Sequence, residues 1–164
     1  MSSFETALRV ILDHEGGYVN DKRDNGGETK YGISKRSYPD LDIPNLTKDQ
    51  AGRIYRKEYW NKIRGDYLPF GIALVLFDMS VNMGVKRSVK FLQGIVGAKR
   101  DGILGDRTME ALHHLSRQYI CEQLTKERIM YYIRLDDFDE FGNGWVSRSI
   151  ETLSVALLIR DYDV

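Results

Sequence analysis

The chain has 164 residues and a mass of 19.0 kDa, which suits one compact unit and is too short for two full-sized domains. Its composition, 42% hydrophobic and 29% charged, argues against wholesale disorder, and the balance of 24 basic against 24 acidic residues leaves no net field to attract nucleic acid. The single cysteine, Cys121, excludes an internal disulfide and a cysteine-based zinc site.

The N-terminal segment MSSFETALRVILDHE predicts a first helix from Ser3 to Glu15. Its apolar residues recur at helical spacing, and Gly16 and Gly17 supply a stop. The segment has no basic n-region, and polar residues interrupt its apolar ones, so neither a signal peptide nor a membrane anchor is expected. The chain as written is therefore expected to be synthesised in the cytoplasm.

The remaining elements also read as mainly helical, with any β-structure confined to a loop or small hairpin at residues 17–34. Thr47 and Gln50 form the sequence pattern of a capping box at the start of a helix that runs to about Trp60. Residues 70–84 are apolar nearly all round and too few to span a bilayer, which indicates a buried central helix. Further helices are predicted at 85–97, 106–135 and 147–160, with an irregular acidic and aromatic stretch at 136–145.

Glu15 has an unusual position for a carboxylate. At about 100° per residue it falls within roughly 20° of Phe4, on the apolar stripe that also carries Leu8 and Ile11. Desolvation and the negative end of the helix dipole would both favour its protonated form, which is what a general acid needs. The alternative is a helix-end acid paired with a lysine or arginine.

The glycine-rich loop that follows carries further acids, and its length would let Asp24 return to within several ångströms of Glu15, with Thr29 nearby. Such a carboxylate pair is typical of glycosidases. Two other interpretations are ordinary turn chemistry and a calcium loop, although the spacing of Asp21, Asp24 and Glu28 lacks the pattern of an EF-hand. No metal site is predicted here.

Two polar residues interrupt the apolar central helix. Asp78 and Asn82 are four residues apart and share a helix face, so they predict a buried polar cluster that either supports a cleft or contacts a sugar directly. Trp145 and Arg148 are expected to contribute packing and a salt bridge. His113 and His114 are adjacent on a helix and face different directions, which argues against a shared metal ion.

Several blocks of the sequence closely resemble the glycoside hydrolase family 108 proteins, which are peptidoglycan-cleaving N-acetylmuramidases with a lysozyme-like helical fold. The blocks are EGGYVND, GGETKYGIS, LTKDQAGRIYRKEYW, LPFGIALVLFDMSVNMG and LQGIVGAKRDGILGDRT, and their order matches over essentially the whole chain. The resemblance implies a catalytic region at residues 1–84 and a helical peptidoglycan-binding region at 85–164, packed as one unit.

The resemblance places the catalytic glutamate of the family on Glu15, within EGGY. The order of Glu15, Asp24 and Thr29 is also similar to the catalytic set of phage-type lysozymes. Substrate contacts are expected from the loop, the hairpin and the central helix, at Gly17, Tyr18, Gly27, Tyr31, Asp78 and Asn82.

The function expected from this resemblance is hydrolysis of the β-1,4 bond between N-acetylmuramic acid and N-acetylglucosamine, without a cofactor. The alternatives are a lytic transglycosylase and a non-catalytic peptidoglycan-binding or secretion-assisting protein. Family members act as phage endolysins or as secretion activators. Reaching the cell wall, in the periplasm or outside the cell, would require a holin-like pore, an export system or lysis.

Overall fold

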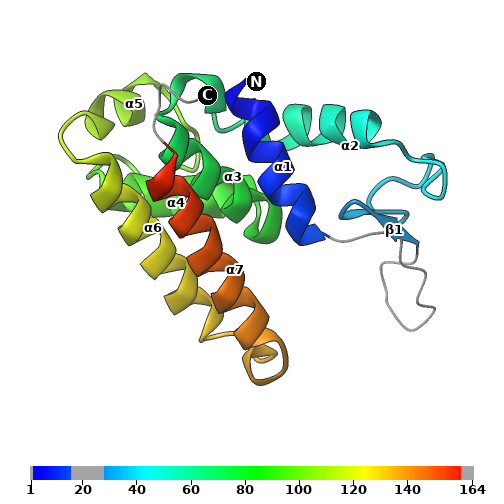
Figure 1. Cartoon of the computed structure of the whole chain (residues 1–164). Helices are drawn as coiled ribbons and strands as arrows, with labels where there is room; N and C mark the ends of the chain where they lie inside the picture. The colour runs from blue at the N-terminus through cyan, green and yellow to red at the C-terminus, as the bar shows by residue number, and fades with distance from the viewer. Residues whose placement is uncertain (1, 16–27, 160–164) are drawn as a thin grey trace.

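The computed structural model describes residues 2–15 and 28–159, and its described part is mainly helical (Figure 1). A two-stranded antiparallel sheet follows the first helix. This arrangement confirms the predicted mainly α fold with a small hairpin. In chain order the elements are α1 (Ser3–Glu15), β1 (Thr29–Lys30), β2 (Ile33–Ser34), α2 (Lys48–Tyr55), η1 (Arg56–Trp60), η2 (Gly65–Tyr67), α3 (Phe70–Met83), α4 (Val85–Ile95), α5 (Asp106–Leu112), α6 (Arg117–Tyr132) and α7 (Phe138–Leu158).

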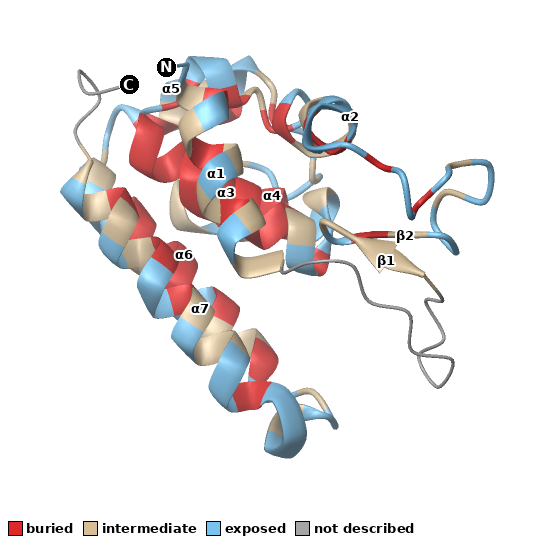
Figure 2. Cartoon of the chain, turned by 45° about the vertical axis from the view of Figure 1, so that its right-hand side comes forward, coloured by how far each residue is buried: buried red, intermediate tan, exposed pale blue. Residues whose placement is uncertain are grey.

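Helix α3 is the centre of the fold, as the apolar run predicts. All of its 14 residues except Val81 and Asn82 are buried, and α1, α4, α6 and α7 pack around it. Figure 2 shows this concentration of buried residues in and around α3. Because α3 touches both the N-terminal and the C-terminal helices, the two halves of the chain share one hydrophobic core.

The start of α2 confirms the predicted capping box. The side chain of Thr47 accepts a hydrogen bond from the backbone N–H of Gln50 at 3.2 Å, and the Gln50 side chain accepts one from the Thr47 N–H at 2.8 Å. After Tyr55 the helix widens into the single π-helical turn η1, which ends at Trp60. A π-helical turn in an otherwise regular helix often marks a functional site.

The hairpin is closed by a two-residue turn in which Tyr31 and Gly32 both have positive φ, at 52° and 72°. Positive φ at both positions is the requirement of a type I′ turn, whose twist matches that of the two strands. Thr29 pairs with Ser34, and Lys30 pairs with Ile33. The hydroxyl of Tyr55 donates a hydrogen bond to the Tyr31 carbonyl at 2.9 Å, which ties the turn to α2.

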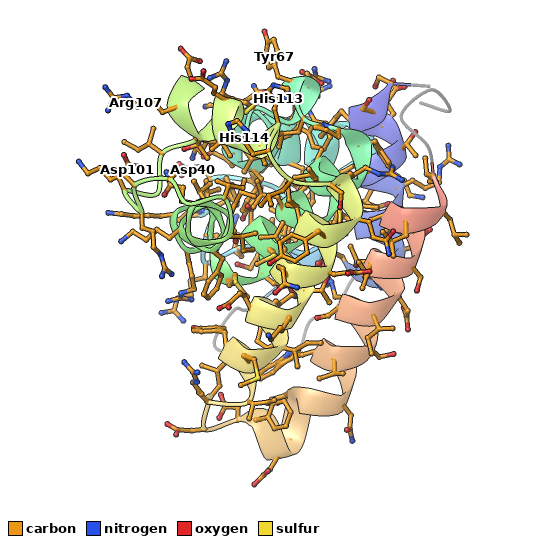
Figure 3. All side chains as sticks on the ribbon, turned by 90° about the vertical axis from the view of Figure 1, so that its left-hand side faces the viewer. Asp40, Tyr67, Asp101, Arg107, His113 and His114 are labelled. Atoms are coloured by element: carbon orange, nitrogen blue, oxygen red, sulfur yellow. The ribbon has the colours of Figure 1, made fainter. Side chains whose placement is uncertain are left out.

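The prediction of one long helix from 106 to 135 is wrong. Helix α5 ends at Leu112, and α6 begins after Ser116, whose side chain accepts a hydrogen bond from the Tyr119 N–H at 3.1 Å. Figure 3 shows His113 and His114 in the segment that joins the two helices. The N-cap starts a new helix, which lets α5 and α6 take different directions over the core (Figure 1).

The prediction of an irregular stretch at 136–145 is also wrong, because α7 begins at Phe138 and is continuous to Leu158. Two glycines in a helix cost about 1 kcal/mol each relative to alanine, but the packing of this segment against α6 outweighs that cost. Trp145 stacks on Tyr132 with 5.1 Å between ring centroids. A Cβ at Gly142 would lie 2.6 Å from the Phe138 ring, so the glycine makes room for an aromatic side chain.

None of the described helices is both long enough and apolar enough to cross a bilayer. Across residues 2–15 and 28–159, no three His, Cys, Asp or Glu side chains are grouped so as to hold a metal ion.

Candidate active site

Glu15 ends α1 with its side chain 17% exposed, on the edge of a polar cavity of about 610 Å³. Phe4 and Ile11 on the same helix are buried, so the apolar stripe faces the core and carries Glu15 inward with it. The described residues that line the cavity come from α1, the hairpin and the segment that follows it, α2, η1, α3 and α7. They are Glu15, Gly32, Ile33, Ser34, Ser37, Tyr38, Ile54, Tyr55, Glu58, Tyr59, Val81, Asn82 and Arg148.

The hairpin brings its backbone against the carboxyl group of Glu15. A Cβ atom at Gly32 would lie 2.5 Å from Glu15 Oε2 and 2.5 Å from the Tyr55 hydroxyl. No side chain fits there, and the φ of 72° is itself one that other residues rarely adopt. Gly32 therefore allows the turn to form one wall of the cavity directly beside the acid.

Three tyrosines also line the cavity. The rings of Tyr55 and Tyr59 lie 5.7 Å apart, and Tyr38 lines the same cavity. Burial, followed by the negative charge of Glu15, raises the pKa of both Tyr55 and Tyr59, so both hydroxyls stay protonated. The Tyr55 hydroxyl donates its proton to the Tyr31 carbonyl. Aromatic faces bordered by hydroxyl groups are well suited to the alternating apolar and polar surfaces of a sugar ring.

A second carboxylate, Glu58, also lines the cavity. Its side chain is 32% exposed and accepts a hydrogen bond from Lys62 Nζ at 2.7 Å. That hydrogen bond lowers the pKa of Glu58, so the group is ionised at neutral pH.

A chain of alternating charges begins at Glu15 and joins four helices. Glu15 pairs with Arg148 of α7, Arg148 pairs with Asp78 of α3, and Asp78 pairs with Arg128 of α6. Asp78 is fully buried, and although burial by itself would raise its pKa, the two guanidinium groups outweigh that effect and hold the pKa below its usual value. The predicted salt bridge of Arg148 is thus confirmed, and so is the packing of Trp145.

Of the two roles predicted for Asp78, the structure favours support of the cleft over direct contact with a sugar. Its side chain exposes no surface, and both of its oxygens are occupied by arginines, so it supports the cleft from behind. Asn82 does line the cavity, and its side-chain amide donates to the Asp78 backbone carbonyl at 2.7 Å. The two residues therefore do not form the buried side-chain cluster that their spacing predicts.

The other predicted residues have different outcomes. Thr29 and Tyr31 belong to the hairpin, but neither is among the described residues that line the cavity. The remaining predicted site residues lie outside the described residues, namely Gly17, Tyr18, Asp24 and Gly27.

Sequence reasoning gave no role in the site to Gly32, Tyr55, Glu58 or Tyr59. The spacing of four between Tyr55 and Tyr59 indicates one shared helix face, but the same spacing is common in helices that only pack. The interpretation of Glu15 as a helix-end acid paired with an arginine is confirmed. Glu15 also borders the cavity, where its role as a general acid stays a prediction.

A helical core, a small hairpin beside the end of the first helix and an acid on a polar cavity define a lysozyme-like protein. The chain belongs to the glycosyl hydrolase 108 family, whose model matches residues 8–84. Residues 87–150 match a second model, described as a predicted peptidoglycan domain. Together the two matches make this a lysozyme-like protein that acts on peptidoglycan.

A solved structure supports this assignment. The chain is similar to the structure of Brucella abortus SagA, with a TM-score of 0.85 and 35% sequence identity over 94% of this chain and 93% of that one. No curated protein matched the sequence.

Proposed function

We propose that the protein is an N-acetylmuramidase that hydrolyses the β-1,4 bond between N-acetylmuramic acid and N-acetylglucosamine, with Glu15 as the general acid. The observation that carries this proposal is the place of Glu15, partly exposed at the end of α1 on a polar cavity walled by tyrosines. Membership of the glycosyl hydrolase 108 family supports it.

In this mechanism Glu15 gives its proton to the glycosidic oxygen as the bond to the anomeric carbon breaks. Tyr59 is partly exposed and offers an aromatic face on which a sugar ring packs, and the buried Tyr55 supports it from behind. Asn82 contributes a side-chain amide at the α3 side of the cavity. These groups would hold the glycan strand with the scissile oxygen at the acid.

Glycoside hydrolysis generally requires a second carboxylate, which activates water or stabilises the positive charge that develops at the anomeric carbon. The proposal assigns this role to Asp24, with Thr29 holding the water. Glu58 is the competing candidate, because it is ionised and lines the cavity. Rates of muropeptide release from Asp24→Ala and Glu58→Gln would separate them, since loss of the second carboxylate should lower the rate by about 100-fold or more.

The main test uses purified sacculi, with loss of turbidity and mass spectrometry of the released muropeptides as readouts. The wild-type protein should release fragments with reducing ends that carry the mass of an added water. Glu15→Gln should be folded by circular dichroism and inactive. Products with 1,6-anhydro ends would instead identify a lytic transglycosylase, and a folded wild-type protein that binds sacculi without releasing fragments would identify a binding protein.

The substrate places the proposed activity at the cell wall, in the periplasm or outside the cell. Passage through a holin-like pore or an export system is the corresponding proposal for how the enzyme reaches it. Fractionation of producing cells, with and without a co-expressed holin, tests this part independently of the chemistry.

A further inference from the structure

Arg148 reaches from the C-terminal region of the chain into the cavity. Its Nη2 atom lies 2.7 Å from Glu15 Oε1 and 2.7 Å from Asp78 Oδ1, and its Nε donates to the same Asp78 oxygen at 2.9 Å. The side chain is 15% exposed. Its contact with Glu15 is therefore a partly buried ion pair, held at two points by Asp78.

The anchor of Arg148 is itself fixed. Asp78 is 0% exposed, Arg128 Nη1 donates to its Oδ2 at 2.5 Å, and the Thr152 hydroxyl lies 3.3 Å from the same oxygen. Burial lowers the pKa of Arg148, but the charges of Asp78 and Glu15 outweigh it and raise the pKa above its usual value, so the guanidinium remains charged. The cation next to Glu15 is thus both permanent and held in place.

The two carboxyl oxygens of Glu15 have different surroundings. Oε1 accepts the contact from Arg148, whereas Oε2 faces the hairpin, where a Cβ at Gly32 would lie 2.5 Å away. In a protonated carboxyl group the oxygen that carries the proton is the weaker acceptor, so an arginine N–H favours the other oxygen as its partner. A proton on Glu15 therefore belongs on Oε2.

We propose that Arg148 is the positioning residue of the catalytic acid: it holds Oε1, leaves Oε2 as the proton-donating oxygen, and stabilises the carboxylate as the proton departs. This inference rests on the proposed function. It also makes the region matched by the predicted peptidoglycan domain a contributor to the active site, because Arg148 lies within residues 87–150.

The Oε2–H bond breaks, and the glycosidic oxygen gains the proton as its bond to the anomeric carbon breaks. Glu15 then carries a negative charge opposite Arg148. Water gives a hydroxyl to the anomeric carbon, its remaining proton passes to solvent, and Glu15 is reprotonated from solvent. Arg148 acts on this sequence by lowering the free energy of the state in which Glu15 is ionised.

The other charged or titratable groups near Glu15 do not duplicate this role. Tyr55 and Tyr59 are neutral, and Asp78 influences Glu15 through its salt bridge with Arg148. His14, the residue before Glu15, pairs with Glu151 of α7 at 3.7 Å, and Glu58 is paired with Lys62. Within the described residues, Arg148 is the arginine or lysine that forms a salt bridge with Glu15.

The test compares Arg148→Met with Arg128→Met in the full-length protein. Both substitutions remove a guanidinium from Asp78, but only Arg148 contacts Glu15, so Arg128→Met is the matched control for a purely structural loss. The measurements are melting temperature and the rate of muropeptide release from sacculi between pH 4 and pH 9, at a temperature where each variant is folded. Arg148→Lys adds a variant that keeps the charge.

A general acid loses activity above the pH at which it loses its proton, and removing a neighbouring cation moves that point to higher pH. Arg148→Met should therefore shift the alkaline limb of the pH–rate profile up by about one pH unit or more, and lower its maximum by about ten-fold. Arg148→Lys should keep the alkaline limb within about half a unit of the wild type. Arg128→Met should lower the melting temperature and leave the limb in place.

The inference is overturned if Arg148→Met leaves the limb unchanged, or if Arg128→Met shifts it equally. If Arg148→Met does not fold, Arg148→Gln, which keeps an N–H donor for Asp78, replaces it with the same expected shift. A wild-type protein that releases no muropeptides overturns the proposed function itself, whereas an active wild type with an unshifted Arg148→Met overturns only the role of Arg148.

Discussion

Replacing Gly32 with alanine should distinguish what the hairpin backbone contributes to stability from what it contributes to the chemistry of the site. The residue has a φ of 72°, and an added Cβ would lie 2.5 Å from both Glu15 Oε2 and the Tyr55 hydroxyl. Non-bonded contacts of a Cβ are ordinarily 3.4 Å or longer. Either the turn or the carboxyl group must therefore move by roughly an ångström.

The substitution should affect stability and activity to different extents. The left-handed backbone costs an alanine about 1–2 kcal/mol, which lowers the melting temperature by about 2–8 °C in a protein of this size. A displacement of about 1 Å at a catalytic group costs on the order of 100-fold in rate. Gly32→Ala should accordingly be folded and only moderately destabilised, yet lose most of its activity.

Gly97 offers a matched control. It has the same φ of 72°, and a Cβ there would have nothing within 4 Å. Gly97→Ala should therefore show a similar drop in melting temperature by differential scanning calorimetry and nearly full release of muropeptides from sacculi. The reasoning is refuted if Gly32→Ala retains more than about a tenth of the wild-type rate, or if Gly97→Ala loses as much activity as Gly32→Ala.

Three further substitutions test the scaffold. Asp78→Asn should cost about 3–5 kcal/mol in chemical denaturation at pH 7, because it leaves the buried Arg128 without its counter-charge. The pKa of Asp78 is lowered in the folded state. The stability that its ionised form contributes is therefore present above the unfolded pKa of about 3.9, and it is lost as the pH falls from there through the lower folded pKa. Denaturation curves between pH 3 and pH 7 should show this loss in the wild type, and an equal slope in the variant would contradict it. Tyr55→Phe removes the hydroxyl that donates to the Tyr31 carbonyl and should cost about 1 kcal/mol in urea unfolding; unchanged stability would mean that this bond does not anchor the hairpin. Thr47→Ala should cost about 1 kcal/mol through the lost helix cap, with no change in the rate of muropeptide release below its melting temperature, and a lower rate would mean that α2 transmits strain to the cavity.

Local sequence patterns predicted several elements well. The apolar spacing from Phe4 to Leu12 gives α1 its bounds, and the Thr47 and Gln50 pair gives the start of α2. Both signals are short-range, because they depend on hydrogen bonds and side chains within one or two helical turns. The same is true of α3, whose uniformly apolar composition indicates burial whatever packs against it.

The pattern failed at two places for different reasons. The acidic and aromatic stretch at 136–145 predicted irregular chain, but α7 begins at Phe138 and the contact of Trp145 with Tyr132 packs this segment against α6. Tertiary contacts there override a weak local propensity. Helical residues on both sides of His113 predicted one long helix, but Ser116 caps a second one. That cap is a local signal, because its hydrogen bond joins residues three positions apart.

The sequence alone determined that the chain is mainly α, that Glu15 ends a helix on its core-facing side, and that a hairpin or loop follows. These conclusions depend on helical phase and turn chemistry, which are properties of neighbouring residues. The tertiary structure decided the surroundings of Glu15. Arg148 is 133 positions further along the chain and Gly32 is 17, and no local pattern specifies that both meet the same carboxyl group. Only the packing of α1, α3 and α7 into one core brings them there.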